Sequence, residues 1–247
     1  MRVSIITGSF NSADTIMDTI KSVNDQTYHN IDHVFIDGGS TDSTLEKIEK
    51  HSLREKAVIS EKDNGIYDAM NKGLNKASGD VIAILNSDDF YADENVVSEV
   101  VNLFENGGAD AVYADLDYIS QTDSSKVIRE WRSGKYDDDK FKWGWMPPHP
   151  TLFVKKEVYK RYGKFNTDFK SAADYEIMLR FIHKNKIKLG YLPRVTVKMR
   201  VGGLSNSSFK HRLFANMEDR KAWKVNNIKP YFFTLIFKPL RKLSQYL

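Results

Sequence analysis

The stretch VIAILNSDD, residues 81–89, decides the fold. Its first five residues form an unbroken apolar run, which is typical of a β-strand buried on both faces of a sheet. Strands of this kind belong to parallel sheets that lie between helices, and ligands bind beyond the carboxyl ends of such strands. Two adjacent carboxylates, Asp88 and Asp89, follow at that end. The stretch therefore predicts an α/β fold and indicates where its binding site lies.

The residues around this stretch alternate between strand and helix patterns. Strands are expected at 3–7, 33–37, 57–60 and 111–118, and helices at 13–26, 43–50, 65–77 and 94–105. In the third helix, apolar side chains recur at helical spacing, for example Ile66, Met70 and Leu74. This β-α-β order predicts a Rossmann-like, doubly wound, mainly parallel sheet.

The chain after residue 118 is less regular. Residues 119–148 are expected to form a loop-rich excursion. Further strands are predicted at 151–155, 188–192 and 196–200, and helices at 156–162, 173–185 and 209–225. A tail rich in aromatic and basic residues, 228–242, follows.

Charge is distributed very unevenly along the 247 residues. Residues 1–123 hold 9 Lys/Arg against 23 Asp/Glu, whereas residues 124–247 hold 28 against 10, within a net charge of +4. The basic second half is therefore expected to meet something anionic, such as nucleic acid, a diphosphate or an acidic membrane surface. Cysteine is absent, which excludes disulfides, thiolate zinc sites and cysteine nucleophiles. With no apparent leader or membrane-spanning run, we expect a cytoplasmic protein.

Small polar side chains follow the first two predicted strands. Thr7, Ser9 and Asn11 come after the first, where a ligand can approach a helix N-terminus; an ordinary strand-to-helix turn would look the same. After the second strand, Asp37 can accept from a base N–H or a ribose hydroxyl, and Gly38 lets the backbone come close. A glycine turn before a helix cap is the alternative.

The pair Asp88-Asp89 requires compensation wherever it is buried, because adjacent carboxylates repel each other. A hard divalent ion with oxygen ligands supplies it, and Mg²⁺ or Mn²⁺ then bridges to substrate phosphates. A lone Asp-Asp pair is common on protein surfaces. Its position, on the same expected sheet edge as Thr7 and Asp37, favours a metal site.

Four motifs in order, TGSFNS, DGGSTDST, EKDNGIYDAMNKG and GDVIAILNSDD, resemble the family 2 glycosyltransferases of the GT-A fold, many of which make bacterial O-antigen, capsule or exopolysaccharide. The resemblance implies that Asp37 binds the nucleoside, that Asp88 lies near the ribose, and that Asp89 holds Mn²⁺ or Mg²⁺ on the diphosphate. Many relatives have arginine at the position of Met70, so Lys72 or Lys62 is expected to compensate. The remaining residues implied to bind the donor nucleotide are Asp63, Asn71, Asn86 and Ser87.

A catalytic base is expected in the segment AADYE, residues 172–176. Asp174 shares an apolar helical face with Met178 and Phe181, whereas Glu176 has Arg180 at i+4 and reads as a surface ion pair. A helix-start aspartate stabilised by the helix dipole is the alternative for Asp174. The resemblance favours Asp174 as the base, although Ala173 stands where the family pattern has glutamate.

Two further segments are candidates for the acceptor or the diphosphate. In WGWMPPHP, residues 143–150, Trp145 offers an aromatic face to a sugar and His149 a hydrogen bond, with core packing as the alternative. Arg200, at the start of RVGGLS, resembles the beginning of a glycine loop that closes on the donor, and its guanidinium is expected to face the diphosphate. An exposed loop would look the same.

The resemblance implies an inverting enzyme that moves a sugar from a nucleotide-diphosphate sugar, with UDP expected, to a polyprenyl-diphosphate-linked glycan. The corresponding regions are 1–118 for the donor, 119–205 for the acceptor and base, and 206–247 for C-terminal helices. The amphipathic tail is expected to hold the protein at the inner face of the plasma membrane; a partner-protein or dimer contact is the alternative. Scattered Lys and Arg argue against nucleic acid, and an oligomer is compatible with the pattern.

Two other functions fit parts of the sequence. A nucleotidyltransferase shares the α/β architecture and an acidic metal site, but the loop at 7–11 lacks the basic residue such enzymes typically carry there. The other hypothesis is a non-catalytic module that binds membrane or nucleic acid through the basic half.

Overall fold

A computed structural model describes residues 1–202, 209–241 and 245. They form one nine-stranded sheet with the order β3-β2-β1-β4-β8-β6-β9-β5, and β7 pairs with β6. Strands β1 to β4, β6 and β9 run in one direction, whereas β5, β7 and β8 are antiparallel to their neighbours. The strands are β1 Val3–Ser9, β2 Ile31–Asp37, β3 Glu55–Ser60, β4 Val81–Ile84, β5 Phe90–Tyr91, β6 Ala111–Ile119, β7 Val127–Trp131, β8 Phe153–Lys155 and β9 Leu189–Arg200. The predicted doubly wound, mainly parallel sheet is thereby confirmed.

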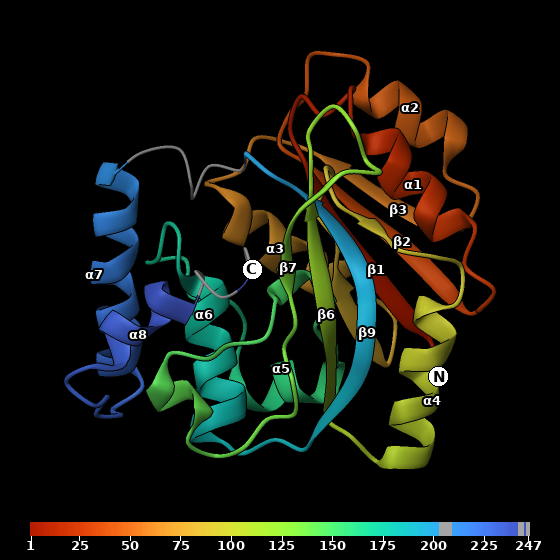
Figure 1. Ribbon diagram of the computed structural model, residues 1–247. Helices are drawn as coiled ribbons and strands as arrows, with labels where there is room; N and C mark the ends of the chain where they lie inside the picture. The colour runs from red at the N-terminus through yellow and green to blue at the C-terminus, as the bar shows by residue number, and fades with distance from the viewer. Residues whose placement is uncertain (203–208, 242–244, 246–247) are drawn as a thin grey trace.

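Helices cover both faces of the sheet (Figure 1). On one face lie α1 Ile16–Asn24, α2 Thr44–His51 and α4 Val96–Gly107. On the other lie α3 Ile66–Lys76, α5 Lys156–Tyr162 and α6 Ala173–Met178, which continues into the π-helical turn η3 Leu179–Lys184. Two C-terminal helices, α7 Phe209–Val225 and α8 Thr234–Arg241, pack beyond α6. The short 3₁₀ turns are η1 Lys140–Trp143 and η2 His149–Thr151.

The core follows from the alternation of side chains along the strands. In β1, Ile6 packs into the cluster under α3 and α6, while Ile5 points to the opposite cluster under α4. One close approach needs glycine: a Cβ on Gly73 of α3 would lie 2.3 Å from Ile6 Cγ2. The helix therefore rests directly on the strand that leads to the site.

The second half departs from the expected elements in three places. Residues 119–148 are not all loop, because β7 pairs with the outer part of β6. The two strands expected at 188–192 and 196–200 are one strand, β9, in which Pro193 falls at a shift of register opposite Ala114 and Asp115. A bulge accommodates the missing N–H of proline without ending the strand. The helix expected at 173–185 changes from α to π geometry after Met178.

Within the described part of the chain, no helix is long and apolar enough to cross a membrane. The division of the chain at residues 118 and 205 stays a prediction.

Candidate active site

Three polar loops meet at one edge of the sheet because β1, β2 and β4 are adjacent and parallel. Ser9 and Asp37 are register partners at the ends of β1 and β2, and Asn86 follows the end of β4. The loops are also bonded to one another. Asn11, in the left-handed region at φ 46°, accepts a hydrogen bond from the backbone N–H of Thr41 at 2.9 Å. The two hydroxyls of Ser12 and Ser87 lie 2.8 Å apart.

Asp37 organises the first of these loops. Its buried carboxylate accepts five hydrogen bonds, which come from the hydroxyls of Ser9, Ser40 and Ser60 and the N–H groups of Gly39 and Ser40. Burial alone would raise the pKa of Asp37, but these donors outweigh it and lower the pKa. The carboxylate is thus ionised and already engaged, and it fixes the backbone that a nucleoside would meet.

Phe10 and Asp63 lie close over Gly38, and we refer to this place as the Gly38 slot. A Cβ at this position would be 2.9 Å from Oδ2 of Asp63 and 3.4 Å from the ring of Phe10. The Phe10 side chain is 62% exposed although it follows a buried strand. An exposed aromatic ring beside a carboxylate oxygen that accepts no hydrogen bond from the described residues suits a flat heterocycle with an N–H donor. Sequence reasoning missed Phe10; a large aromatic directly after a strand at the binding edge was the signal that could have revealed it.

The acidic loop after β4 is held by α1. The Thr19 hydroxyl donates to the carbonyl oxygen of Asp89 at 2.7 Å and also reaches that of Asn86 at 3.3 Å. The Asn86 amide donates to Oδ2 of Asp89 at 2.9 Å. Asp89 is fully buried, and Asp88 is half-buried. The loop is therefore rigid before any ligand arrives.

The ionised forms of Asp88 and Asp89 are unfavourable in this loop without a bound cation. Burial raises the pKa of Asp88, and burial together with the Asp88 charge raises the pKa of Asp89 well above its ordinary value. Oδ1 of Asp89 is buried and has no hydrogen-bond partner among the described residues. A divalent cation there would satisfy the oxygen and relieve the repulsion.

The residues present fit a metal that the substrate helps to hold. No group of three or more acidic, histidine or cysteine side chains in the described ranges could bind a metal by itself. Mg²⁺-type sites in phosphate-transfer chemistry commonly use one or two carboxylates plus the phosphates. Asp89, with Asp88 beside it, offers that ligand set.

Arg200, expected at the diphosphate, has partners within the protein. Its buried guanidinium donates to the carbonyl oxygen of Asp88 at 2.7 Å and pairs with the carboxylate of Asp18. It also lies 5.2 Å from the ring centre of Phe90. Arg200 thus fastens the acidic loop to α1, and a role at the diphosphate stays a prediction. Residues 203–205 of the expected glycine loop lie outside the described residues.

The candidate base, Asp174, lies in the first turn of α6 and is half-buried. The Tyr67 hydroxyl, from α3, donates to its Oδ1 at 3.4 Å. His149, on η2, is close enough for the Asp174 charge to act on it. Burial lowers the pKa of His149 and the Asp174 charge opposes this, so the imidazole is neutral at pH 7; its Nε2 is buried without a partner among the described residues.

The helix that carries Asp174 is supported by α7. The buried Glu218 carboxylate accepts from the backbone N–H groups of Lys170 and Ser171 at 2.8 and 2.7 Å, and from the Ser171 hydroxyl at 2.8 Å. Asn226 donates to Glu176 at 2.9 Å. A C-terminal helix therefore sets the position of the candidate base.

We expect Glu218→Ala to lower kcat about tenfold to a hundredfold, because displacing a reacting group by about 1 Å has an effect of that size. The substitution also leaves two partly buried N–H groups without their carboxylate partner, so the melting temperature should fall. Met217→Ala, on the same helix but exposed, is the matched control and should change neither quantity. The measurements are thermal unfolding and turnover well below the melting temperature; wild-type kcat in Glu218→Ala would remove this support role.

Several predicted site residues have structural partners instead. The Thr7 hydroxyl is fully buried 2.9 Å from Nε2 of His33, whose pKa burial lowers to about 3. Both polar ends of the Asn71 side chain bond the backbone of Phe165, at 2.9 and 3.0 Å. These two residues hold the fold together and do not face a nucleotide.

Further expectations meet partners within the protein. The Lys72 ammonium pairs with the exposed Glu61 at 2.8 Å, and its expected part in place of the missing arginine stays a prediction. Trp145 is 2% exposed and its indole N–H donates to the Ser133 carbonyl, so it belongs to the core and not to an acceptor surface. The Glu176–Arg180 pair is buried, not a surface pair.

The chain matches known proteins over most of its length. The sequence model described as "Glycosyl transferase family 2" matches residues 4–163. An uncharacterized glycosyltransferase of Mycobacterium tuberculosis (strain H37Rv) is 32% identical over 186 residues, which cover 72% of this chain and 68% of that protein. A PGL/p-HBAD biosynthesis glycosyltransferase of Mycobacterium bovis (strain BCG) is 28% identical over 209 residues, covering 83% and 79%.

Solved structures share the fold at low identity. S. aureus TarS 1-349 in complex with UDP-GlcNAc gives a TM-score of 0.68 at 16% identity, covering 92% of this chain and 65% of that one. The mannosyltransferase PcManGT from Pyrobaculum calidifontis, in complex with GDP-Man and Mn²⁺, gives 0.67 at 18% identity, covering 99% and 69%. At these identities the likeness establishes the GT-A fold alone.

Proposed function

Because this chain belongs to glycosyl transferase family 2, we propose that it is an inverting enzyme that transfers a sugar from a nucleotide-diphosphate sugar, a UDP-sugar, to a lipid-linked glycan. Family membership makes it a glycosyltransferase, which sets aside the nucleotidyltransferase and non-catalytic alternatives. The observation that carries the finer proposal is the meeting of the Gly38 slot and the Asp88-Asp89 loop at one sheet edge.

The donor would lie across these two features. The base would lie beside Phe10 and Asp63 at the Gly38 slot, and Asn11 follows Phe10 in the same loop. Ser87 and Asp88 would bind the ribose, and the Asn86 amide, which donates to Asp89, would orient that carboxylate. The TarS structure holds UDP-GlcNAc and the PcManGT structure holds GDP-Man, which supports a nucleotide sugar as the donor class.

Asp89, with Asp88 beside it, would hold Mn²⁺ or Mg²⁺. When bound, such an ion stabilises the negative charge of the departing diphosphate. PcManGT was solved with Mn²⁺, which supports this assignment.

Asp174 would take the proton from the acceptor hydroxyl, whose oxygen then attacks the anomeric carbon opposite the leaving diphosphate. The Tyr67 hydroxyl holds one carboxylate oxygen and leaves the other for the acceptor. His149 is neutral and can donate to or accept from an acceptor hydroxyl at the same place. In this proposal Asp174 acts only as a base, and no protein group attacks the sugar. A single displacement of this kind inverts the configuration of the anomeric carbon.

A lipid-linked acceptor would bring the enzyme to a membrane surface, here the cytoplasmic face. We assign this contact to the aromatic patch, which consists of Trp143, Tyr231, Phe232 and Phe233. Phe232 is 92% exposed, and the Trp143 ring lies 4.9 Å from that of Phe233. The Lys238 ammonium pairs with Asp219 at 2.6 Å and so anchors α8 beneath the patch. The Lys142 ammonium lies 5.1 Å from the centre of the Tyr231 ring. Aromatic rings beside such a cation suit the interface of an anionic bilayer.

The patch is tested by sedimentation with vesicles. We expect binding to anionic vesicles to exceed binding to neutral ones and to weaken in Phe232→Ser. Equal binding of wild type and variant would rule out this contact without touching the reaction. We also propose that the acceptor is a polyprenyl-diphosphate-linked glycan and that the enzyme acts in bacterial surface polysaccharide synthesis. The relative named as a PGL/p-HBAD biosynthesis glycosyltransferase supports a biosynthetic role.

The donor is tested by thermal unfolding with UDP-, GDP- and dTDP-sugars, each with and without Mn²⁺. A ligand at a hundredfold above its Kd stabilises the native state by about 2.7 kcal/mol, so the true donor should raise the melting temperature clearly. We expect the UDP-sugars to do so, and only with the metal. A panel without any shift would contradict the proposal, and a shift with GDP- or dTDP-sugars alone would correct the nucleotide.

A further inference from the structure

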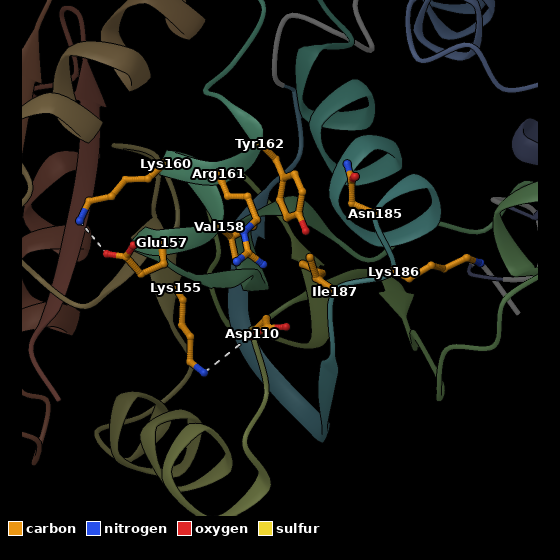
Figure 2. A pocket seen from close by; sticks show the side chains of 10 residues that line it. All are labelled: Asp110, Lys155, Glu157, Val158, Lys160, Arg161, Tyr162, Asn185, Lys186 and Ile187. Atoms are coloured by element: carbon orange, nitrogen blue, oxygen red, sulfur yellow. Dashed lines mark hydrogen bonds and ion pairs between the residues drawn. The ribbon is translucent and has the colours of Figure 1, made fainter.

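A hollow of about 690 Å³ opens between α5 and the turn that joins η3 to β9 (Figure 2). Its floor is apolar, formed by Val158 and Ile187, and its rim is strongly polar. We refer to it as the α5 hollow. The donor, the metal and the base proposed above make no use of it.

The α5 hollow lies at the opposite edge of the sheet from the acidic loop. Lys155, which lines it, pairs with Val81, the first residue of β4. Asp88 comes seven residues later, beyond the other end of that strand. Val3 of β1 is the register partner of Val81, and Ser9, at the active-site end of β1, comes six residues later. At about 3.3 Å per residue the separation is roughly 20 Å, too far for one nucleotide sugar to occupy both.

Positive charge dominates the rim, and one cation lacks a carboxylate. Four of the lining residues are basic and two are acidic. Three of the cations are paired, Lys155 with Asp110 at 3.7 Å, Lys160 with Glu157 at 2.6 Å and Lys186 with Asp138 at 3.1 Å. The fourth is Arg161, which has no ion pair with any described residue.

Arg161 is also the cation best placed for a ligand. Figure 2 shows its guanidinium turned into the space between α5 and residues 185–187, beside Tyr162, whereas the side chains of Lys160 and Lys186 extend away to either side. The Tyr162 hydroxyl forms no hydrogen bond within the described part of the chain. The hollow therefore presents a guanidinium fork and a phenol over an apolar floor.

The backbone at the rim is strained. Lys186 has a φ of 52°, in the left-handed region that side chains other than Asn, Asp and Gly rarely adopt. It directly follows a π-helical turn and Asn185, whose amide donates to the Arg180 carbonyl at 2.8 Å. Both features are associated with functional sites. Here they hold Asn185 and Lys186 at the edge of the hollow.

We propose that the α5 hollow is a second anion site, in which Arg161 binds a phosphate group as a bidentate donor, with Tyr162 as a further donor. A planar guanidinium matches two phosphate oxygens, and such charge-assisted bonds are among the strongest polar contacts. The site goes beyond the proposed transfer reaction and accounts for part of the basic charge of the second half. The phosphate belongs either to a phospholipid headgroup or to a soluble phosphorylated molecule.

The test is a titration of the protein with inorganic phosphate at constant ionic strength, without divalent metal, followed by the Arg Nε–Hε resonances in ¹H–¹⁵N spectra. The Arg161 resonance, identified by its absence in Arg161→Lys, should move with phosphate. Arg161→Ala should weaken phosphate binding about tenfold or more. Lys50→Ala, which removes one exposed cation from α2, is the matched control and should leave the binding within about twofold.

A parallel arm separates the two sources of phosphate. Sedimentation with phosphatidylcholine vesicles, with and without phosphatidic acid, is compared for the same variants. If Arg161→Ala loses binding to vesicles with phosphatidic acid and Lys50→Ala does not, the site binds a lipid headgroup. If the Arg161 resonance moves with free phosphate but Arg161→Ala binds vesicles as the wild type does, the site binds a soluble ligand. The proposal is overturned if Arg161→Ala matches the wild type in both arms, or if Lys50→Ala weakens binding equally. Because Arg161 is exposed, all variants should keep the wild-type melting temperature, and donor-induced stabilisation reports separately on the proposed reaction.

Discussion

Replacing Asp174 with asparagine is expected to lower the turnover number by about 10²–10⁴-fold, the usual contribution of a positioned general base. The amide has the same shape and its oxygen can still accept from the Tyr67 hydroxyl, which lies 3.4 Å from Oδ1. It cannot take a proton. Donor binding should be nearly unchanged, so KM for the donor should move far less than kcat.

The measurement is release of nucleoside diphosphate from the donor in the presence of Mn²⁺. Asp168→Asn is the matched control, because Asp168 is exposed, lies six residues earlier and receives the same chemical change. Full turnover in Asp174→Asn would show that another group takes the proton. His149→Gln would then be the next variant to make, since His149 lies beside the same carboxylate.

Replacing Asp89 with asparagine is expected to separate activity from stability. Loss of the metal ligand removes several kcal/mol of charge stabilisation, which corresponds to on the order of a thousandfold in turnover. The substitution should not destabilise the fold. The pKa of Asp89 is raised above 3.8 in the folded chain, so its ionised form is less favourable there than in the unfolded chain and costs stability at neutral pH. Without metal, the variant should therefore unfold at the same temperature as the wild type or higher.

Two measurements check this expectation. Turnover is titrated with Mn²⁺, and thermal unfolding is followed at pH 7 in a chelator. The comparison variant is Asp88→Asn, which is expected to weaken donor binding more than it weakens metal activation, because Asp88 is assigned to the ribose. Wild-type dependence on Mn²⁺ in Asp89→Asn would show that the ion is held elsewhere.

The sheet and its acidic loop were predictable because the signals are local. The apolar run at 81–85 and the carboxylates that follow it occupy one short segment, and the hydrophobic period of each neighbouring helix is read within a dozen residues. The topology rule for parallel sheets then brings the ends of β1, β2 and β4 together without further information.

Side-chain roles were harder to predict because the partners lie far away in the sequence. Asn71 bonds residue 165, and Arg200 bonds residue 88. Nothing near Asn71 or Arg200 in the sequence reveals these contacts, so a resemblance to relatives assigned both residues to the ligand. Burial was a second obstacle. Glu176 and Arg180 have the spacing of a surface pair, but α7 covers them and converts the pair into an internal support.

The bonds from Glu218 and Asn226 to the region of α6 have a consequence for the order in which the enzyme matures. The sheet ends with β9 at Arg200, so the ribosome has synthesised the whole sheet more than twenty residues before it adds Asn226. N-terminal segments fold first during synthesis. The nascent chain is thus expected to acquire its donor cleft early, while the Asp174 segment still lacks the contacts that fix it. The chain would therefore be able to bind a nucleotide sugar before it can transfer the sugar, and folding of α7 onto α6 would complete the catalytic site.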